Sequence, residues 1–175
     1  MSSPLPGDRP DESAPAPTTT DATRPLDPPS GFRPLRTMGD FIAVNGPLYV
    51  RSEGGSVQLG FRVEARHTNP MHICHGGMMA SFCDMLLPLS VHRKSHEVGM
   101  RFLPTISLQI DYLAPAPLGA WVQGEAQVLR TTRSLVFAQG LVEADGTPVA
   151  RVSGIFKIGP PFGDAAIAPN QEPAS

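Results

Sequence analysis

The sequence predicts an α+β domain in which a curved antiparallel sheet of about six strands wraps around one long central helix. Three observations support this fold class. Residues 48–65 alternate apolar and polar side chains around a glycine pair, residues 76 to about 90 are almost continuously apolar, and residues 104–158 return to alternation. A helix without a polar stripe is buried on every side, and a curved sheet buries it economically in a small domain.

The composition is that of an ordinary globular protein. Hydrophobic residues make up 41% and charged residues 17% of the 175 residues, and the formal net charge is -2. This near-neutral charge, with scattered Lys and Arg, argues against a nucleic-acid-binding surface. The two cysteines, Cys74 and Cys83, lie on or beside one helix, where a disulfide is not expected. We therefore expect a cytoplasmic protein, and neither a signal peptide nor a membrane span is predicted.

The chain divides into three segments by composition. Residues 1–34 hold nine of the 20 prolines and no aromatic residue before Phe32, which predicts a disordered tail. Residues 159–175 have the same character and predict a flexible C-terminal tail. The folded domain is expected between them, over residues 35–158.

The strands are predicted from alternation and from turn residues. Gly54 and Gly55 suit the tight turn of a hairpin within residues 48–65. Four more strands are expected after residue 104, interrupted by Pro and Gly or by Asp-Gly and Thr-Thr pairs. Their ranges are 105–114, 120–130, 134–144 and 147–158.

The predicted helix carries one carboxylate, Asp84, in its apolar run. A buried carboxylate must be paired, neutralised or used, because leaving it unpaired is costly. Helical spacing places Asp84 on a face of small residues with Gly77, Ala80 and Ser81. Two interpretations stay open: Ser81, backbone N–H groups or water at a dimer seam satisfy the acid, or it does chemistry. Pro88 opposes the carbonyl of Asp84, which predicts that the helix kinks or ends there.

A second candidate feature precedes the helix, where Asn69 and His75 stand ahead of Gly76 and Gly77. Glycines at a helix start allow a ligand to approach the backbone, and the N–H groups there can stabilise an oxyanion. By themselves these residues could equally form a turn with ordinary polar loop side chains. Together with Asp84 they suggest a site that polarises an electrophile.

The motif N-x5-HGG-x7-D runs from Asn69 to Asp84 and is followed by the segment Thr105–Tyr112 and by LAPAPLG. Over about residues 45–158 this order resembles the hotdog-fold acyl-CoA thioesterases of the phenylacetate-pathway and 4-hydroxybenzoyl-CoA type. The resemblance implies the hotdog fold, a homodimer that joins two sheets, and hydrolysis of acyl-CoA to free acid and CoA without metal or bound cofactor. Whether dimers pair into tetramers, and which acyl group is cleaved, is left open.

The resemblance also implies roles for individual residues. The oxyanion donor falls on the backbone N–H of Gly76, and the general base or nucleophile falls on Asp84. Asn69 and His75 would orient the thioester carbonyl or the water, and Thr105 would help to hold the water or substrate. Substrate contacts are implied at Gly77, Tyr112, Arg130, Arg133 and Ser134.

Helix geometry adds an expectation about assembly. Gly76 and Asp84 are about 12 Å apart along one helix, which is too far for both to touch one carbonyl. If the helices of two subunits pair about a two-fold axis, Gly76 of one can face Asp84 of the other. Two identical shared sites then result.

Several alternatives remain at this point. A non-catalytic acyl-CoA-binding or regulatory hotdog domain would keep the pocket without turnover, although the intact Asp84 argues against it. An enoyl-CoA hydratase of the same fold is disfavoured because no Asp-x4-His pattern is evident. Cys74 beside His75 could suggest a thiol nucleophile. A metal site could be drawn from His72, Cys74, His75, His92 and His96, but these lack compact four-ligand spacing, and no metal is expected.

Overall fold

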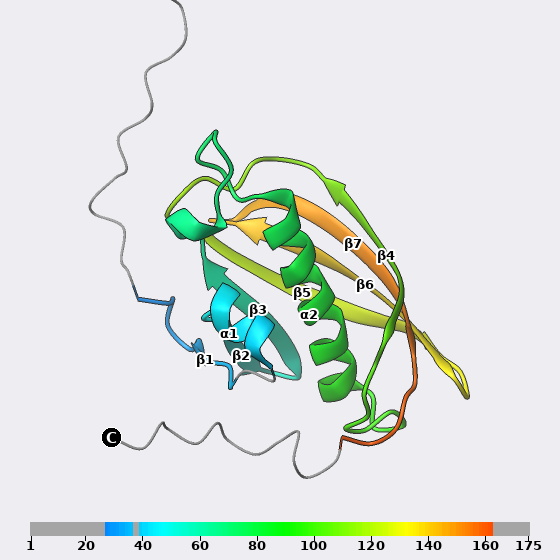
Figure 1. Ribbon diagram of the computed structural model, residues 1–175. Helices are drawn as coiled ribbons and strands as arrows, with labels where there is room; N and C mark the ends of the chain where they lie inside the picture. The colour runs from blue at the N-terminus through cyan, green and yellow to red at the C-terminus, as the bar shows by residue number, and fades with distance from the viewer. Residues whose placement is uncertain (1–26, 37–38, 163–175) are drawn as a thin grey trace, which may run out of the picture.

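One long helix lies against one face of an antiparallel sheet that curves around it (Figure 1). This computed structural model describes residues 27–36 and 39–162. The arrangement confirms the predicted fold class, a hotdog fold. The described elements are β1 (Arg33–Pro34), α1 (Asp40–Asn45), β2 (Tyr49–Glu53), β3 (Ser56–Arg62), a 3-10 turn (Ala65–His67), α2 (Gly76–Lys94), β4 (Thr105–Tyr112), β5 (Trp121–Thr131), β6 (Leu135–Ala144) and β7 (Thr147–Lys157).

The predicted hairpins form where the glycines allow them. Strands β2 and β3 pair from Glu53 and Ser56 outward, and Gly54 and Gly55 both have positive φ angles of 56° and 82°. A two-residue turn with two positive φ angles matches the twist of the flanking strands, and glycine adopts it without strain. Asp145 and Gly146 form an equivalent turn between β6 and β7, with φ angles of 47° and 83°.

The strand order is β1-β2-β3-β5-β6-β7-β4. Strand β4 follows α2 in the chain but crosses to the far edge of the sheet, where it pairs antiparallel with β7. The other edge is the two-residue strand β1, so the described sheet has seven strands rather than the expected six or so. Strand β4 is therefore the long free edge, and it also borders helix α2.

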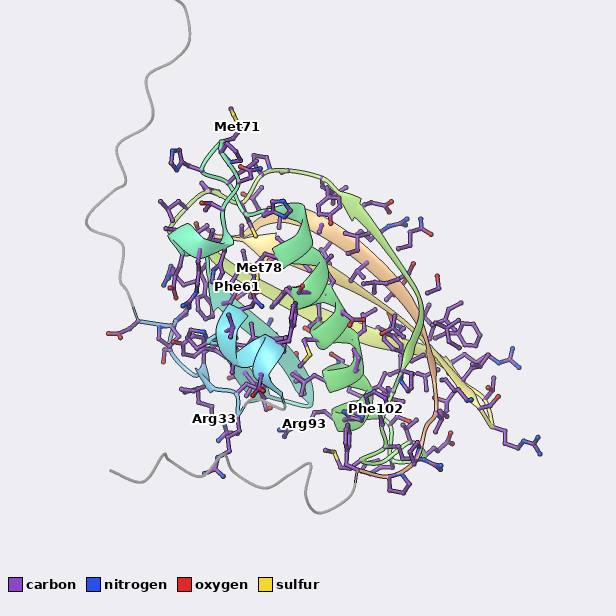
Figure 2. The ribbon with its side chains drawn as sticks, in the orientation of Figure 1. Arg33, Phe61, Met71, Met78, Arg93 and Phe102 are labelled. Atoms are coloured by element: carbon purple, nitrogen blue, oxygen red, sulfur yellow. The ribbon has the colours of Figure 1, made fainter. Side chains whose placement is uncertain are left out.

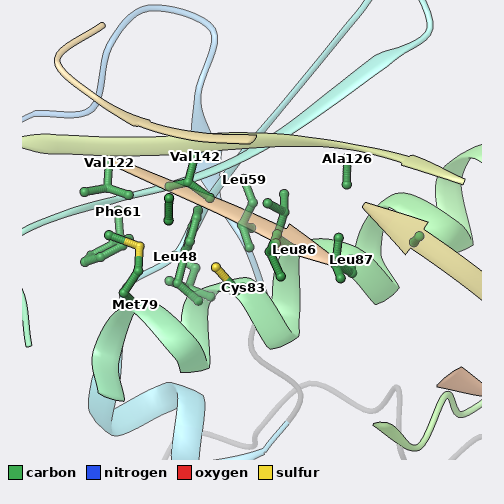
Figure 3. Packing of buried hydrophobic residues seen from close by; sticks show 14 of the residues in the cluster. Leu48, Leu59, Phe61, Met79, Cys83, Leu86, Leu87, Val122, Ala126 and Val142 are labelled. Atoms are coloured by element: carbon green, nitrogen blue, oxygen red, sulfur yellow. The ribbon is translucent and has the colours of Figure 1, made fainter. Parts of the chain in front are cut away.

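Helix α2 packs on the sheet through its large apolar side chains (Figure 3). Phe82, Leu86 and Leu87 are fully buried, and Figure 3 shows Leu86 and Leu87 between the helix and the strands. Two strand glycines make this contact possible. A Cβ atom on Gly124 would lie 2.6 Å from Cδ2 of Leu86, and one on Gly154 would lie 2.8 Å from Cδ1 of Leu87. The helix can therefore lie closer to the sheet than side chains at these positions would allow.

Pro88 lies inside α2, and the helix continues past it to Lys94. Of the two expected outcomes at Pro88, a kink or the end of the helix, the second is therefore wrong. Proline removes one backbone hydrogen bond and crowds the preceding turn. The helix is buried on both sides of the proline, through Leu86 and Leu87 before it and Ser90 and Val91 after it. Tertiary packing therefore outweighs the local cost of the proline.

The sheet extends slightly beyond residues 35–158. Phe32 is buried, its ring meets Trp121 edge-on at 5.0 Å, and β1 pairs with β2, although all of these N-terminal residues fall in the segment expected to be a tail. At the other end, the Gly159 N–H donates to the Phe102 carbonyl and the Phe162 N–H to that of Met100. The remaining tail segments, 1–26 and 163–175, lie outside the described residues. None of the described helices is long and apolar enough to cross a membrane.

Candidate active site

The first turn of α2 presents a backbone donor. His75 is the N-cap residue, and its ring Nδ1 accepts a hydrogen bond from the Gly77 N–H at 2.9 Å. The His75 carbonyl accepts the Met79 N–H at 3.1 Å. Within the described chain the Gly76 N–H has no hydrogen-bond acceptor. An unsatisfied donor at the positive end of a helix suits an oxyanion.

Tyr112, the last residue of β4, reaches the same turn from the sheet. Its hydroxyl donates to the Gly76 carbonyl at 2.8 Å. The ring lies alongside the glycine, since a Cβ atom there would meet the Tyr112 ring and hydroxyl at 3.4–3.7 Å. Tyr112 therefore contacts the helix backbone directly, a contact that its expected role in substrate binding did not include.

Asp84 lies two turns further along α2 and is half-buried. Thr105, the first residue of β4, donates its hydroxyl to Oδ1 of Asp84 at 2.6 Å. This bond orients the carboxylate. The structure thus brings together two residues that the sequence placed 21 positions apart.

The hydroxyl of Ser81 does not satisfy Asp84. It donates instead to the Gly77 carbonyl, one turn earlier in the helix, at 2.9 Å. The interpretation that Ser81 satisfies the Asp84 carboxylate is therefore wrong. In a helix, a serine hydroxyl can readily donate to the backbone carbonyl four residues earlier, and Ser81 does so in preference to the Asp84 side chain.

Asn69 supports the loop that leads into the helix. Its side-chain Oδ1 accepts the N–H groups of Met71 at 3.0 Å and Ile73 at 3.4 Å, and its own N–H donates to the Ile73 carbonyl at 2.9 Å. In Figure 2 the labelled Met71 marks the tip of this loop beyond the start of α2. The amide oxygen of Asn69 is thus occupied by the loop backbone.

Most of the residues implied for coenzyme A contacts lie far from Gly76 of the same chain. Arg130 lies near the end of β5, and Arg133 and Ser134 form the turn to β6; the two arginines and the serine are exposed. The tip of this hairpin lies at the opposite end of the sheet from the start of α2 (Figure 1). Only Tyr112 among the distant expected contacts lies beside the helix start.

A groove of about 370 Å³ opens beside the N-terminal turn of α2. Helix α1 forms its other wall, and neither α1 nor this groove was expected from the sequence. A six-residue helix is too short for periodicity to reveal, although the apolar run FIAV before Gly46-Pro47 is a weak signal. The lining residues are Phe41, Asn45, Arg66, His67, Thr68, His75, Gly77, Met78 and Ser81.

His67 is the buried polar residue of this groove, with only 2% of its surface exposed. Its ring Nε2 lies 3.2 Å from Nε of Arg66, and its Nδ1 lies 3.0 Å from the Glu64 backbone nitrogen and 3.2 Å from the Arg62 carbonyl oxygen. A neutral imidazole donates from one ring nitrogen and accepts at the other, so a second ring proton would have to face one of the two N–H donors. Burial, followed by the nearby Arg66 charge, lowers the pKa of His67 below its usual 6.5. Both causes favour the neutral form of the ring.

The two cysteines are free thiols. Burial raises the pKa of Cys74 to about 11 and is the main cause that raises the pKa of Cys83 to about 12. Neither thiol ionises readily near neutral pH, which argues against Cys74 as a nucleophile. No three His, Cys, Asp or Glu side chains converge in the described ranges as a metal site would require.

The sequence model of the thioesterase superfamily matches residues 71–150, which include the helix, Asp84 and β4. A Pseudomonas aeruginosa protein named as a candidate esterase is 24% identical over 131 residues, covering 74% of this chain and 96% of that protein. The superfamily match thus includes the start of α2, Asp84 and β4, whereas Asn69 and most of the groove lining lie before it.

Solved structures show the same fold. Zebrafish thioesterase superfamily member 2 is 27% identical with a TM-score of 0.57, covering 64% of this chain and 81% of that one. A variant of the phenylacetic acid degradation protein PaaI from Thermus thermophilus is 23% identical with a TM-score of 0.57, covering 67% and 96%. A hypothetical thioesterase with coenzyme A from Streptococcus pneumoniae is 18% identical with a TM-score of 0.57, covering 66% and 88%.

These likenesses agree with the geometry. The last two structures are too distant in sequence to show more than the shared fold. The superfamily match, however, includes the HGG and Asp84 parts of the motif and begins two residues after Asn69. The chain is therefore a hotdog-fold protein related to the thioesterase superfamily, and the resemblance predicted from its HGG and Asp motif is confirmed.

Proposed function

We propose that this protein hydrolyses acyl-CoA thioesters. The observation that carries the proposal is the pairing of two features on one helix: the Gly76 N–H without an acceptor in the described chain, and Asp84 oriented by Thr105. An oxyanion donor and a positioned carboxylate are what acyl transfer to water requires. The choice of a thioester follows the match to the thioesterase superfamily.

In this scheme water is the second substrate. Asp84 takes a proton from the water as its oxygen attacks the thioester carbonyl, and the Gly76 N–H stabilises the oxyanion that forms. The carbon–sulfur bond then breaks, the proton passes to the departing thiolate, and free acid and CoA are released. If Asp84 instead attacks directly, an anhydride forms first and water cleaves it.

The active unit in this proposal is a homodimer. Strand β4 is a free sheet edge of eight residues, and a long unpaired edge readily accepts another strand. Exposed apolar side chains accompany this edge: Phe102 is 52%, Ile106 57% and Leu113 55% exposed. A two-fold axis at β4 would join two sheets and bring the two α2 helices together. Gly76 of one subunit would then complete a site with Asp84 of the other.

The groove beside α1 is a candidate for the acyl group. It begins at His75 and Gly77, next to the proposed oxyanion donor, and its volume falls within the range of small-molecule pockets. Its lining mixes apolar Phe41 and Met78 with several polar side chains. This mixture favours an acyl group with polar atoms over a long plain alkyl chain.

Thiol release from a panel of aromatic and aliphatic acyl-CoAs tests the proposal. Wild-type protein should release CoA, and Asp84→Asn should lower kcat by about 100-fold or more, because the amide keeps the shape but loses the basicity. Thr105 can still donate to the amide oxygen, so the variant should stay folded. Binding of acyl-CoA without turnover would favour the non-catalytic alternative, and hydration of an enoyl-CoA would favour a hydratase.

Mixed dimers test the shared site. Asp84→Asn and Gly76→Pro each damage a different half of the proposed site. After subunit exchange, each mixed dimer should hold one intact and one doubly damaged site, so a random mixture should regain about a quarter of wild-type activity. No recovery in mixtures shown by native mass spectrometry to contain mixed dimers would reject the shared site.

A further inference from the structure

The peptide that joins Gly76 to Gly77 is held from both of its polar atoms. Its carbonyl oxygen accepts the Tyr112 hydroxyl at 2.8 Å, and its N–H, which belongs to Gly77, donates to Nδ1 of His75 at 2.9 Å. The N–H groups of a first helical turn have no helical acceptor, so the His75 ring supplies one for Gly77. This peptide follows directly after the proposed oxyanion donor.

Two consecutive glycines would otherwise make this turn the least constrained part of α2. Without a Cβ atom each glycine has access to much more φ/ψ space, and helix ends fray easily. Rotation about Gly76 changes the direction of its N–H relative to its carbonyl. Holding the carbonyl therefore restricts where the N–H points, and an oxyanion donor is effective only when its direction is fixed in advance.

Strand β4 touches the helix from both of its ends. Thr105, its first residue, bonds to Asp84, and Tyr112, its last residue, bonds to the Gly76 carbonyl. The strand runs beside the helix between these two contacts (Figure 1). One edge strand thus orients both proposed catalytic features.

We infer that Tyr112 is a positioning residue for the Gly76 oxyanion donor, acting through the hydrogen bond from its hydroxyl to the Gly76 carbonyl. This inference rests on the proposed thioesterase function and replaces the expectation that Tyr112 contacts coenzyme A. In a shared dimer site, Tyr112 serves the site that contains its own Gly76. Thr105 of the same strand serves the other site, through its own Asp84.

The variant Tyr112→Phe removes only the hydroxyl and keeps the ring beside Gly76. We expect kcat to fall about 5- to 10-fold with KM unchanged, which is the scale of one lost hydrogen bond and less than the loss of an oxyanion donor itself. Tyr49→Phe is the matched control, because Tyr49 packs on Trp121 in the β2 region and should leave both constants unchanged. A raised KM with unchanged kcat would assign Tyr112 to substrate binding and overturn the inference.

Mixed dimers give a second readout that a general loss of stability would not produce. Tyr112→Phe mixed with Asp84→Asn should create one wild-type site per mixed dimer. Tyr112→Phe mixed with Gly76→Pro should create none, because both changes lie in the Gly76 half. The reverse pattern would place Tyr112 with Asp84 and overturn the inference, while failure of the Asp84→Asn and Gly76→Pro pair to recover would instead reject the shared site.

A measurement independent of activity separates this inference from the proposed function. In protein labelled with ¹⁵N-glycine, Tyr112→Phe should increase the mobility and hydrogen exchange of the Gly76 and Gly77 amides, while Tyr49→Phe should not. If the wild-type protein cleaves no thioester, the proposed function fails, yet these amides should still respond. Unchanged amide dynamics together with unchanged kcat would reject the positioning role.

Discussion

The two long faces of helix α2 serve different purposes. The face toward the sheet carries Phe82, Leu86 and Leu87, which are fully buried, and it meets glycines in β5 and β7 that admit it closely. The opposite face carries Gly77, Ser81 and Asp84, which are small or polar and at least partly exposed. One face is fixed by packing, and the other leaves room for a ligand or a second subunit.

This difference shows how the fold separates stability from chemistry. Changes on the packed face should lower the free energy of unfolding, because large side chains there fill space that nothing else can occupy. Changes on the open face and at the helix start should lower turnover and leave stability nearly unchanged, because few buried contacts are lost. The following experiments test that separation.

The largest effect is expected at the helix start. Gly76→Pro removes the proposed oxyanion donor, and kcat should fall by about 100-fold or more. The structure suggests that the fold will tolerate this change. Proline is favoured at the first helical position, and His75 already has the extended conformation, with ψ of 136°, that a residue before proline prefers.

Gly76→Ala is the control for that experiment, because it keeps the N–H. Its Cβ atom would make ordinary contact with the Tyr112 ring. Circular dichroism and native mass spectrometry should show that both variants are folded with the wild-type subunit number. If Gly76→Pro has wild-type kcat, or if Gly76→Ala loses as much as Gly76→Pro, the N–H of Gly76 is not the donor.

The next effect is on stability. Leu86→Ala should lower the free energy of unfolding by about 2–5 kcal/mol, as expected for a fully buried leucine whose cavity cannot collapse. Ser81→Ala, on the open face, should change it by less than about 1 kcal/mol, since it loses one hydrogen bond to the Gly77 carbonyl. Urea unfolding measures both. Equal losses in the two variants would contradict the separation of the faces.

The smallest effect concerns the buried His67 in the groove wall. Because burial and Arg66 lower its pKa, the unfolded chain binds a proton more readily than the folded protein once the pH falls below the usual 6.5. The contribution of His67 to the free energy of unfolding is therefore fully present above pH 6.5. It declines as the pH falls toward the lower pKa that the residue has in the folded protein. The decrease in Tm between about pH 7.5 and about pH 5.5 should be smaller in His67→Gln than in wild type.

His96→Gln provides the comparison for this pH experiment, since it removes an exposed histidine that does not line the groove. Differential scanning fluorimetry across the pH range is sufficient. A His67→Gln variant with the same pH-dependent decrease as wild type would show that another group controls it.

Much of the fold followed from local patterns in the sequence. The hairpin at Gly54-Gly55, the strands after Pro104 and the helix beginning at Gly76 lie within a few residues of their predicted positions. Alternation, apolar runs and turn glycines each depend on neighbouring residues only, so a sequence pattern records them. The short helix α1 was missed because six residues hold too little periodicity. The helix does not end at Pro88, one of the two expected outcomes there, because packing outweighs the local cost of the proline.

The sequence by itself determined the long helix, the main strands and the identity of the chemical groups: a glycine pair at a helix start, one acid in an apolar helix, and the spacing between them. Only the tertiary structure decided how these groups are held. The bonds from Thr105 to Asp84 and from Tyr112 to Gly76 span 21 and 36 positions, and they exist because β4 crosses to the edge of the sheet beside α2. Such contacts depend on sheet order and helix packing, which the whole core determines. The residues that make these contacts show no periodic pattern in the sequence that would predict them.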